Sequence, residues 1–469
     1  MRARSGEAAA ATRGSAIRLA AELGSRALAL ATVFLLSVGL GVEGWGTWAA
    51  LAGVAAIAAQ LANAGTQELA CRVLLAGRVS LGAMVRARGM LTLVVLAAAA
   101  VSVVAGVRGL VPARALLLAV LTVDLVLTGW VEFLGTVLRA RGRRAEEALL
   151  LLLVRAMGLA AVALALRGGA ALLAVALAHT ASTAVPLVLA IRLVRALEEA
   201  PSAASARPLE VLKLSWPLAV NSGLALASLR LEVVALFAWR GATEAGLFAL
   251  ALKIVESLNG IPGSISGGAL PALTREALAQ GPPAARERTA RTIALMAVPG
   301  AATLSLLAPR VAAAWSAAYA PAGPYLRVLA LALVPMFVNA LLLHCLIAAG
   351  RPQRVPVLTA VRVAVAGLLA LALVPTWGAA GAAWGFLAAE GALLLAAARA
   401  CAAVGFAVPL ASPLAWGAAL ALPCTAAAAL GGAGLVVPGT AAAIVYALLA
   451  MGVMAHARGL ERKEAMGIR

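Results

Sequence analysis

The sequence has little charge and few aromatic side chains for its length. Charged residues make up 12% of the 469 residues, and aromatic residues make up 4%. A soluble domain is typically about one quarter charged and about half apolar. This chain is 64% apolar, with a mean hydropathy of +1.01, which is more apolar surface than one soluble core can bury. The composition therefore excludes an ordinary soluble enzyme or binding domain.

Cysteine is also scarce, and no CxxC spacing occurs. The four cysteines lie in or beside apolar runs, so we interpret them as small packing residues. No GxxxxGK[ST] motif is present, which argues against ATP hydrolysis by a P-loop. No segment between apolar runs exceeds about 25 residues, which leaves no room for an extramembrane catalytic domain. We expect no enzyme activity, no cofactor and no metal site.

Acidic residues are half as frequent as basic ones, and the net charge is +19. Such an excess raises the possibility of nucleic-acid binding. However, the sequence has neither a long basic tail nor a basic patch interleaved with aromatic residues. The arginines instead lie between apolar runs, where they set the orientation of membrane spans. We therefore expect a membrane lipid environment and no nucleic-acid partner.

The apolar residues form continuous runs, each long enough to cross ~30 Å of hydrocarbon. The runs are rich in Ala and Leu, which favour helix, and they lack the alternation of β-barrel strands. The predicted fold is therefore all-α, a polytopic membrane protein of about fourteen transmembrane helices. The predicted spans are 18–41, 46–66, 89–107, 115–138, 146–166, 170–191, 212–238, 243–268, 292–309, 328–349, 355–375, 379–398, 413–432 and 434–455.

Loop charges predict the topology of these spans. With a cytoplasmic N-terminus, 27 of the 38 basic residues fall in inner segments, 6 in outer loops and 5 within spans. An excess of Lys and Arg marks the cytoplasmic side. We therefore predict a bacterial inner-membrane protein with an even number of spans and both termini in the cytoplasm.

The chain also repeats itself weakly. The segments Gly41–Trp48 and Gly241–Phe248 join spans 1 to 2 and 7 to 8, and each carries two glycines five residues apart. Gly142 and Gly350 precede spans 5 and 11, 208 residues apart. These matches predict two six-helix halves of one orientation, related by an axis along the membrane normal, with Gly46 near Gly246. The predicted parts are an N-terminal six-helix bundle (1–195), a cytoplasmic linker (196–211), a C-terminal six-helix bundle (212–400), and two extra helices with a cytoplasmic tail (401–469).

Several of these segments resemble bacterial polysaccharide flippases. The resemblance covers most of residues 15–400, and its individual motifs are degenerate. The motifs that carry it are Gln60-Leu-Ala-Asn63-Ala-Gly65, Ser215-Trp-Pro217-Leu-Ala-Val-Asn221, Gly246-Leu-Phe248 through Glu256, Tyr319-Ala-Pro321 through Leu329, and Trp377-Gly378 through Gly385. The family is the oligosaccharide (O-antigen) flippase branch of the multidrug/oligosaccharidyl-lipid/polysaccharide (MOP) superfamily.

The resemblance implies a V-shaped pair of six-helix bundles around a central cavity. It also implies alternating access that moves lipid-diphosphate-linked oligosaccharide across the inner membrane for polysaccharide export. Expected partners are this lipid-linked substrate, membrane lipid, and a polysaccharide polymerase or glycosyltransferases. Two alternatives stay open: a cation-coupled multidrug exporter of the same superfamily, and an integral-membrane glycosyltransferase or polymerase.

Charges within apolar spans are costly and mark candidate sites. The cations are candidates for binding a diphosphate, and the acids are candidates for coupling transport to an ion. Ion pairing or snorkelling of long side chains to the interface would also explain several of them. The candidate cations are Arg26, Arg230, Lys253, Arg155 and Arg362, and the candidate acids are Asp124, Glu132, Glu256 and Glu390.

Three finer expectations accompany these candidates. Arg18, Glu22 and Arg26 are spaced along one helix face, as in an ion-pair ladder. Lys253 and Glu256 are three residues apart on one helix, which suits an ion pair. The histidines at 179 and 344 are isolated in the sequence, so we interpret them as polar groups of the core or of a cavity.

Overall fold

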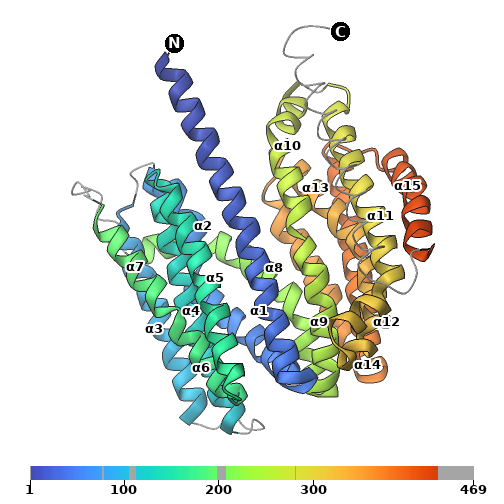
Figure 1. Cartoon of the computed structure of the whole chain (residues 1–469). Helices are drawn as coiled ribbons and strands as arrows, with labels where there is room; N and C mark the ends of the chain where they lie inside the picture. The colour runs from blue at the N-terminus through green and yellow to red at the C-terminus, as the bar shows by residue number, and fades with distance from the viewer. Residues whose placement is uncertain (1, 76–78, 105–111, 198–207, 280, 431–469) are drawn as a thin grey trace. The chain divides into compact units, whose positions relative to one another are not determined.

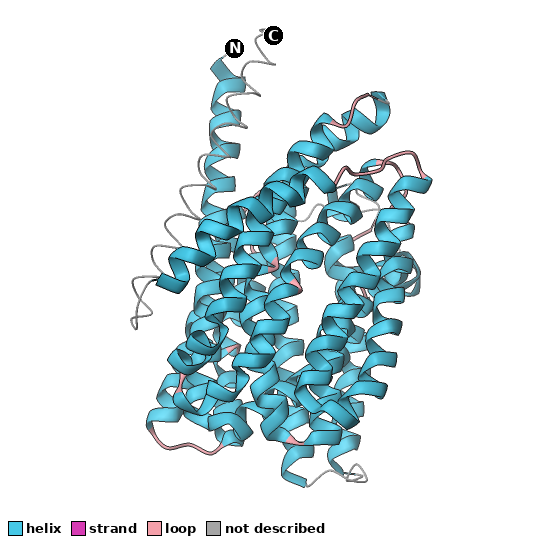
Figure 2. Cartoon of the chain, turned by 90° about the vertical axis from the view of Figure 1, so that its right-hand side faces the viewer, coloured by secondary structure: helices cyan, strands magenta, loops and turns pink. Residues whose placement is uncertain are grey.

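The computed structural model describes residues 2–75, 79–104, 112–197, 208–279 and 281–430. Over these ranges the chain forms fifteen α-helices and one 3-10 helix, and no strand occurs among them (Figure 2). The all-α fold predicted from the continuous Ala- and Leu-rich runs is confirmed. In such runs each backbone N–H and C=O is satisfied within its own helix, as a lipid environment requires.

Ten segments of the described residues are long and apolar enough to cross a membrane. Two of them, Gly24–Ala70 and Arg354–Ala403, contain a glycine with non-helical backbone angles, at Gly41 and Gly378 respectively. These kinks coincide with the predicted breaks between spans 1 and 2 and between spans 11 and 12. The predicted span 13 corresponds to a helix at 411–430, and the predicted span 14 (434–455) lies outside the described residues.

The chain divides into two compact units, Met1–Gly246 and Leu247–Arg469 (Figure 1). The division falls later than the predicted linker at 196–211, because the helix at 208–240 packs with the first unit. That the chain consists of two six-helix halves related by an internal repeat stays a prediction.

Unit 1 is arranged around α4. This helix contacts α1, α2, α3, α5, α6 and α7, and more than half of its last ten residues are buried. Its position explains why polar side chains on it meet partners from several helices. The helices of unit 1 are α1 (Arg2–Asn63), α2 (Thr66–Leu75), α3 (Leu81–Val104), α4 (Pro112–Ala140), α5 (Arg144–Arg167), α6 (Leu172–Ser182), α7 (Ala184–Arg195), α8 (Pro208–Arg240) and the first turn of α9 (Ala242–Leu258).

Unit 2 is arranged around α11 and α13. Helix α11 contacts α10, α12, α13 and α15, and α14 packs against α12 and α13. The helices of unit 2 are the rest of α9, α10 (Gly260–Ala279), α11 (Ala284–Trp315), the 3-10 helix η1 (Ala317–Ala322), α12 (Gly323–Leu331), α13 (Leu333–Ala348), α14 (Arg354–Ala403) and α15 (Ala411–Leu430).

The backbone conformation repeats where the sequence repeats. Gly41 and Gly241 have φ angles of 70° and 89°, and Gly142 and Gly350 have φ angles of 80° and 72°. Side chains disfavour positive φ angles, so glycine suits each of the four positions. This recurrence supports an internal repeat at the level of local structure.

Large apolar side chains also cover the outside of the helices. Leu93 on α3, Leu164 on α5 and Leu422 on α15 are each about two thirds exposed or more, at 69%, 69% and 72%. Exposed apolar surface of this kind is unfavourable in water but suits contact with lipid tails. The outer surface therefore supports a membrane-embedded protein.

Candidate functional site

Two ion pairs line the interior of unit 1 between α4 and α5. Arg139 at the end of α4 lies 3.1 Å from Glu147 near the start of α5. Seven residues earlier on α4, Glu132 lies 3.7 Å from Arg155. Seven residues are close to two helical turns, so Glu132 and Arg139 share one face of α4. The candidate residues Glu132 and Arg155 therefore meet, a pairing that their sequence positions do not reveal.

A third polar pair lies further along α4, where the helix faces α6. Asp124 is buried, and its carboxylate oxygen lies 3.1 Å from Nδ1 of His179. The hydroxyl of Thr183 donates to the same oxygen at 3.4 Å. The ring of Trp48, from α1, packs edge-on against the imidazole, with ring centroids 6.2 Å apart. Residues of α1, α4 and α6, together with Thr183 between α6 and α7, thus surround one carboxylate and one imidazole.

A cavity of about 250 Å³ opens between α2, α4 and α5, along the two ion pairs. Its wall combines both signs of charge with amide, hydroxyl and apolar groups. Such a cavity gives water a route to the polar face of α4. It is lined by Gln67, Val131, Glu132, Gly135, Thr136, Arg139, Glu147, Ala148, Leu150, Leu151, Val154 and Arg155.

Arg88 is a buried cation that sequence reasoning missed. We expected it in a cytoplasmic loop ahead of a span starting at residue 89, but α3 starts at Leu81 and buries Arg88. Its guanidinium donates to the side chains of Asn63 at 2.6 Å and Thr66 at 3.1 Å. It also lies over the aromatic ring of Trp130, 5.2 Å from the centroid. The apolar residues that precede Arg88 in the sequence could have indicated that the helix begins before this arginine.

The candidate cations of α1 and α8 lie in unit 1. Arg26 on α1 is exposed, and Arg230 on α8 is half-buried. Gly53 of α1 lies beside Arg230, because a Cβ at Gly53 would be in ordinary contact with that arginine, 3.5 Å from its Cβ and 3.6 Å from its Cδ. The other members of the expected ladder on α1, Arg18 and Glu22, have side chains outside the described part of the structure.

Lys253 and Glu256 form the ion pair that their spacing predicts. The ammonium nitrogen lies 3.1 Å from the carboxylate, on α9 in unit 2. The lysine side chain is 35% exposed and the glutamate 9% exposed. The carboxylate therefore lies on the buried side of the pair and the ammonium on its open side.

Arg362 and Glu390 form a buried ion pair within α14. The two residues lie on opposite sides of the kink at Gly378, and Nε of the arginine donates to the carboxylate at 2.7 Å. Asn339 of α13 donates to the other carboxylate oxygen at 2.8 Å. The guanidinium also lies over the ring of Phe386. In this conformation the pair joins the two arms of α14, and a role in binding substrate or a coupling ion stays a prediction.

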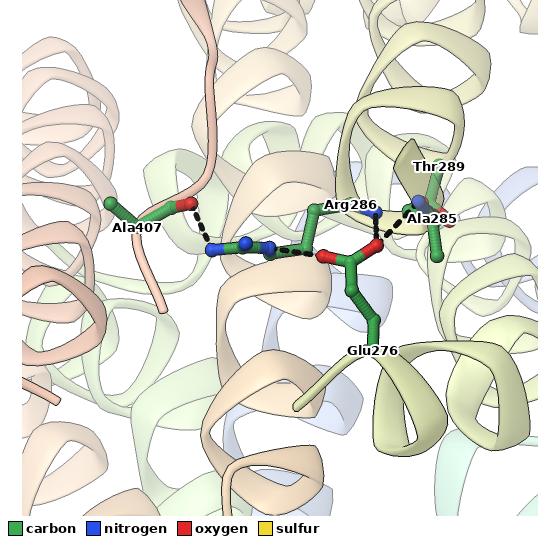
Figure 3. Close-up of polar contacts among 5 residues, drawn as sticks. All are labelled: Glu276, Ala285, Arg286, Thr289 and Ala407. Carbon is green, nitrogen blue, oxygen red and sulfur yellow. Dashed lines mark hydrogen bonds and ion pairs between the residues drawn. The ribbon is translucent and has the colours of Figure 1, made fainter. Parts of the chain in front are cut away.

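A second buried network in unit 2 joins three chain segments (Figure 3). Glu276 of α10 accepts hydrogen bonds from the backbone N–H of Ala285 at 2.5 Å and from Nε of Arg286 at 2.5 Å. Arg286 in turn donates to the carbonyl oxygen of Ala407 at 2.6 Å, and its guanidinium lies 4.0 Å from the centroid of the Phe406 ring. Glu276 therefore caps α11 while the arginine holds the connection between α14 and α15.

Unit 2 also contains an apolar cavity of about 380 Å³. Residues of α9, α10, α11 and α13 line it together with Cys424 of α15. Across the described part of the chain, no three His, Cys, Asp or Glu side chains lie close enough together to hold a metal ion.

Sequence comparison finds no relatives for this chain. No family model matches the sequence, and no curated protein matches it.

Structural comparison does find relatives. A structure described as the lipid II flippase MurJ in an inward closed conformation has a TM-score of 0.76 at 12% identity, covering 93% of this chain and 98% of that one. An inward-facing multidrug resistance transporter of the MATE family of the MOP superfamily has a TM-score of 0.59 at 18% identity, covering 83% of this chain and 98% of that one. The eukaryotic MATE transporter AtDTX14 has a TM-score of 0.55 at 15% identity, covering 87% of this chain and 98% of that one. The chain therefore shares the fold of polytopic MOP-type transporters.

Proposed function

We propose that this protein is a flippase that moves a lipid-diphosphate-linked oligosaccharide across the bacterial inner membrane by alternating access. The observation that carries the proposal is the likeness to the lipid II flippase, which extends over more of the chain than the likeness to drug transporters. The polysaccharide-flippase motifs of the sequence point to the same substrate class. Both termini are proposed to lie in the cytoplasm, as the loop charges predict.

The chemistry of the substrate explains why cations belong on α1 and α8. A diphosphate carries at least two negative charges and has to cross a region of low dielectric constant, where an uncompensated charge is costly. Guanidinium groups stay charged there and bind phosphate oxygens bidentately. We assign this role first to Arg26, which is exposed, and to Arg230, which is half-buried.

The other three candidate cations each form an ion pair with a carboxylate, and the exposure of that pair ranks them. Lys253 pairs with Glu256, Arg155 pairs with Glu132 and Arg362 pairs with Glu390. A substrate phosphate would have to compete with that carboxylate. The pairs on Lys253 and Arg155 are partly exposed and suit such an exchange better than the buried pair on Arg362. We therefore rank Arg362 last among the substrate-binding candidates.

A cation-coupled multidrug exporter is the second candidate function. The likeness to MATE transporters favours it, together with the burial of two of the candidate acids, Asp124 and Glu390. Buried acids within membrane helices are frequent sites for coupling ions. The glycosyltransferase and polymerase enzymes of polysaccharide synthesis are expected partners of a flippase. A drug exporter would not need them.

Reconstitution separates the two functions. Purified protein would be placed in liposomes that contain a fluorescent lipid-diphosphate-linked disaccharide, and movement between leaflets would be followed with a membrane-impermeant quencher. We expect protein-dependent movement of this probe, and slower movement of the same lipid with a single phosphate. Transport of ethidium under a pH gradient, with no movement of the lipid-linked probe, would establish the exporter instead.

A further inference from the structure

Asp124 is the only aspartate in the chain, and it lies within an apolar span. Its carboxylate is buried in the interior of unit 1. The polar side chains that reach it within the described residues are the imidazole of His179 and the hydroxyl of Thr183. No Lys or Arg among the described residues forms an ion pair with it.

Charge balance gives this pair a reason to bind a proton. A carboxylate buried beside a neutral imidazole leaves one uncompensated negative charge in a medium of low dielectric constant, which costs several kcal/mol or more. One added proton removes that cost, either as an imidazolium beside a carboxylate or as a neutral imidazole beside a carboxylic acid. Imidazole is suited to this exchange, because an unperturbed histidine changes charge between about pH 5 and 8.

The surroundings of His179 place the incoming proton at a defined atom. When Nδ1 donates to the carboxylate, Nε2 is the basic nitrogen of the ring. That nitrogen faces Gly158 of α5, where a Cβ would lie 2.9 Å from it. Gly158 therefore lets the imidazole pack against α5 more closely than a larger residue would allow.

Other charged groups on the helices packed around α4 lie apart from this pair. Glu132 on the same helix is bound to Arg155 of α5, about two turns away from Asp124. Arg88 of α3 binds Asn63 and Thr66. Among the side chains that the structure describes, the remaining charged groups on these helices are Arg26 and Glu43 on α1, Glu68 on α2, Arg86 on α3, Arg114 and Arg139 on α4, Arg143, Arg144, Glu146, Glu147 and Arg167 at the ends of α5, and Arg192 and Arg195 on α7.

The cavity between α4 and α5 lies on two of the helices that surround this pair, but neither Asp124 nor His179 lines it. Glu132 and Arg155 line the cavity, and Asp124 lies eight residues, or ~12 Å, further along α4 from Glu132. Chains of carboxylates and histidines form proton relays in membrane transporters.

We propose that Asp124 and His179 form a binding site for one proton inside unit 1. The proton adds to Nε2 of the imidazole or to the carboxylate, and its departure restores the neutral ring and the carboxylate. A role of this site in coupling rests on the proposed transport function, and the coupling ion would then be a proton. The binding of the proton itself does not depend on the substrate.

Magnetic resonance tests the site without any substrate. The full-length protein would be labelled with ¹³C and ¹⁵N in aspartate and histidine and measured in lipid nanodiscs between about pH 5 and 9. Asp124 contributes the single aspartate carboxyl signal, and His179 is one of three histidines. We expect one of these two groups to gain a proton as the pH falls, with a reciprocal change in the signal of the other.

Four variants decide the outcome. His179→Gln assigns the signal, and His344→Gln is the matched control, because His344 lies in unit 2 and bonds to the carbonyl of Ala340. Asp124→Asn should abolish the coupled change while leaving the signal of His344 unaltered. Gly158→Ala should alter the His179 signal without removing any titrating group. If wild-type His179 and Asp124 keep the same protonation throughout the pH range, the site is a fixed structural pair and the proposal is wrong.

The same test separates this proposal from the proposed function. Failure of the lipid-linked probe to move would remove the flippase function and leave the titration intact. Absence of the titration would remove the proton site and leave the flipping assay intact.

Discussion

Gly46 of α1 and Gly246 of α9 pack backbone against backbone. A Cβ at Gly46 would overlap the carbonyl oxygen of Ala242, and a Cβ at Gly246 would overlap the carbonyl oxygen of Val42. The predicted proximity of these two glycines is therefore confirmed. Since the two residues occupy equivalent positions in the repeat, the contact joins the turn after span 1 to the turn after span 7 through small residues alone.

Substitution at this contact should destabilise the protein. Gly246→Ala places a methyl group against rigid backbone, and overpacking of this kind costs ~1–3 kcal/mol or more. We expect a lower melting temperature of the purified protein and a smaller yield of monodisperse material. Gly223→Ala on α8 is the matched control, because no atom lies within 4 Å of a Cβ added there. Equal melting temperatures for the two variants would contradict the close packing.

The cations of α1 and α8 should control the rate of flipping. Arg26→Ala should slow movement of the lipid-linked probe by about tenfold or more, because a hydrogen bond to a charged group contributes ~1.5–3 kcal/mol. Arg26→Lys should retain part of the rate, since a point charge remains. Arg230→Ala should act in the same direction as Arg26→Ala.

Arg167→Ala controls for the loss of an exposed arginine, because Arg167 is an exposed residue at the end of α5 and is not one of the candidate cations. Wild-type rates in both Arg26→Ala and Arg230→Ala would show that these arginines serve only the membrane interface.

The ion pair in α14 should behave as a structural element. Arg362→Met leaves the Glu390 carboxylate buried without its counter-charge, which costs ~3–5 kcal/mol. Adding Glu390→Gln should restore most of the lost stability, because a neutral amide no longer needs a counter-charge and still offers an acceptor to Asn339. Thermal unfolding of the single and double variants measures this coupling.

The flipping assay on the same double variant separates structure from binding. A stable double variant with the wild-type rate assigns the pair to the fold, whereas a stable but inactive one assigns Arg362 or Glu390 to transport.

The network at Arg286 should control access to the connection before α15. Phe406 is buried beneath the guanidinium, so chymotrypsin should cleave there slowly in the wild type. Arg286→Ala removes the bonds to Glu276 and Ala407 and should accelerate cleavage at Phe406 and lower the melting temperature. Arg275→Ala is the matched control, since Arg275 is exposed beside Glu276 on α10. Unchanged cleavage in Arg286→Ala would contradict the holding role.

The chain order of apolar runs and glycines determined the helices and their breaks. A run of about 20 apolar residues satisfies its own backbone hydrogen bonds and buries its side chains in lipid, so its structure depends on few distant residues. The kinks at Gly41 and Gly378 could be placed for the same reason, because a glycine-ended turn is a local feature. The Lys253–Glu256 pair followed from helix spacing alone.

Only the tertiary structure decided which charges meet. Asp124 and His179 are 55 residues apart, and Arg362 and Glu390 are 28 apart, so helix packing and rotation set both contacts. For Asp124 and His179, the sequence offered one signal, which is that both lie at a similar depth in the membrane. Each is about ten residues into a predicted span, and both spans start on the same side of the membrane. Helical periodicity on largely apolar helices does not fix rotation, because nearly every face is apolar. Arg88 illustrates the same limit. From the sequence, a basic residue near the end of a span is interpreted as a cytoplasmic topology signal, but in the structure this arginine is buried.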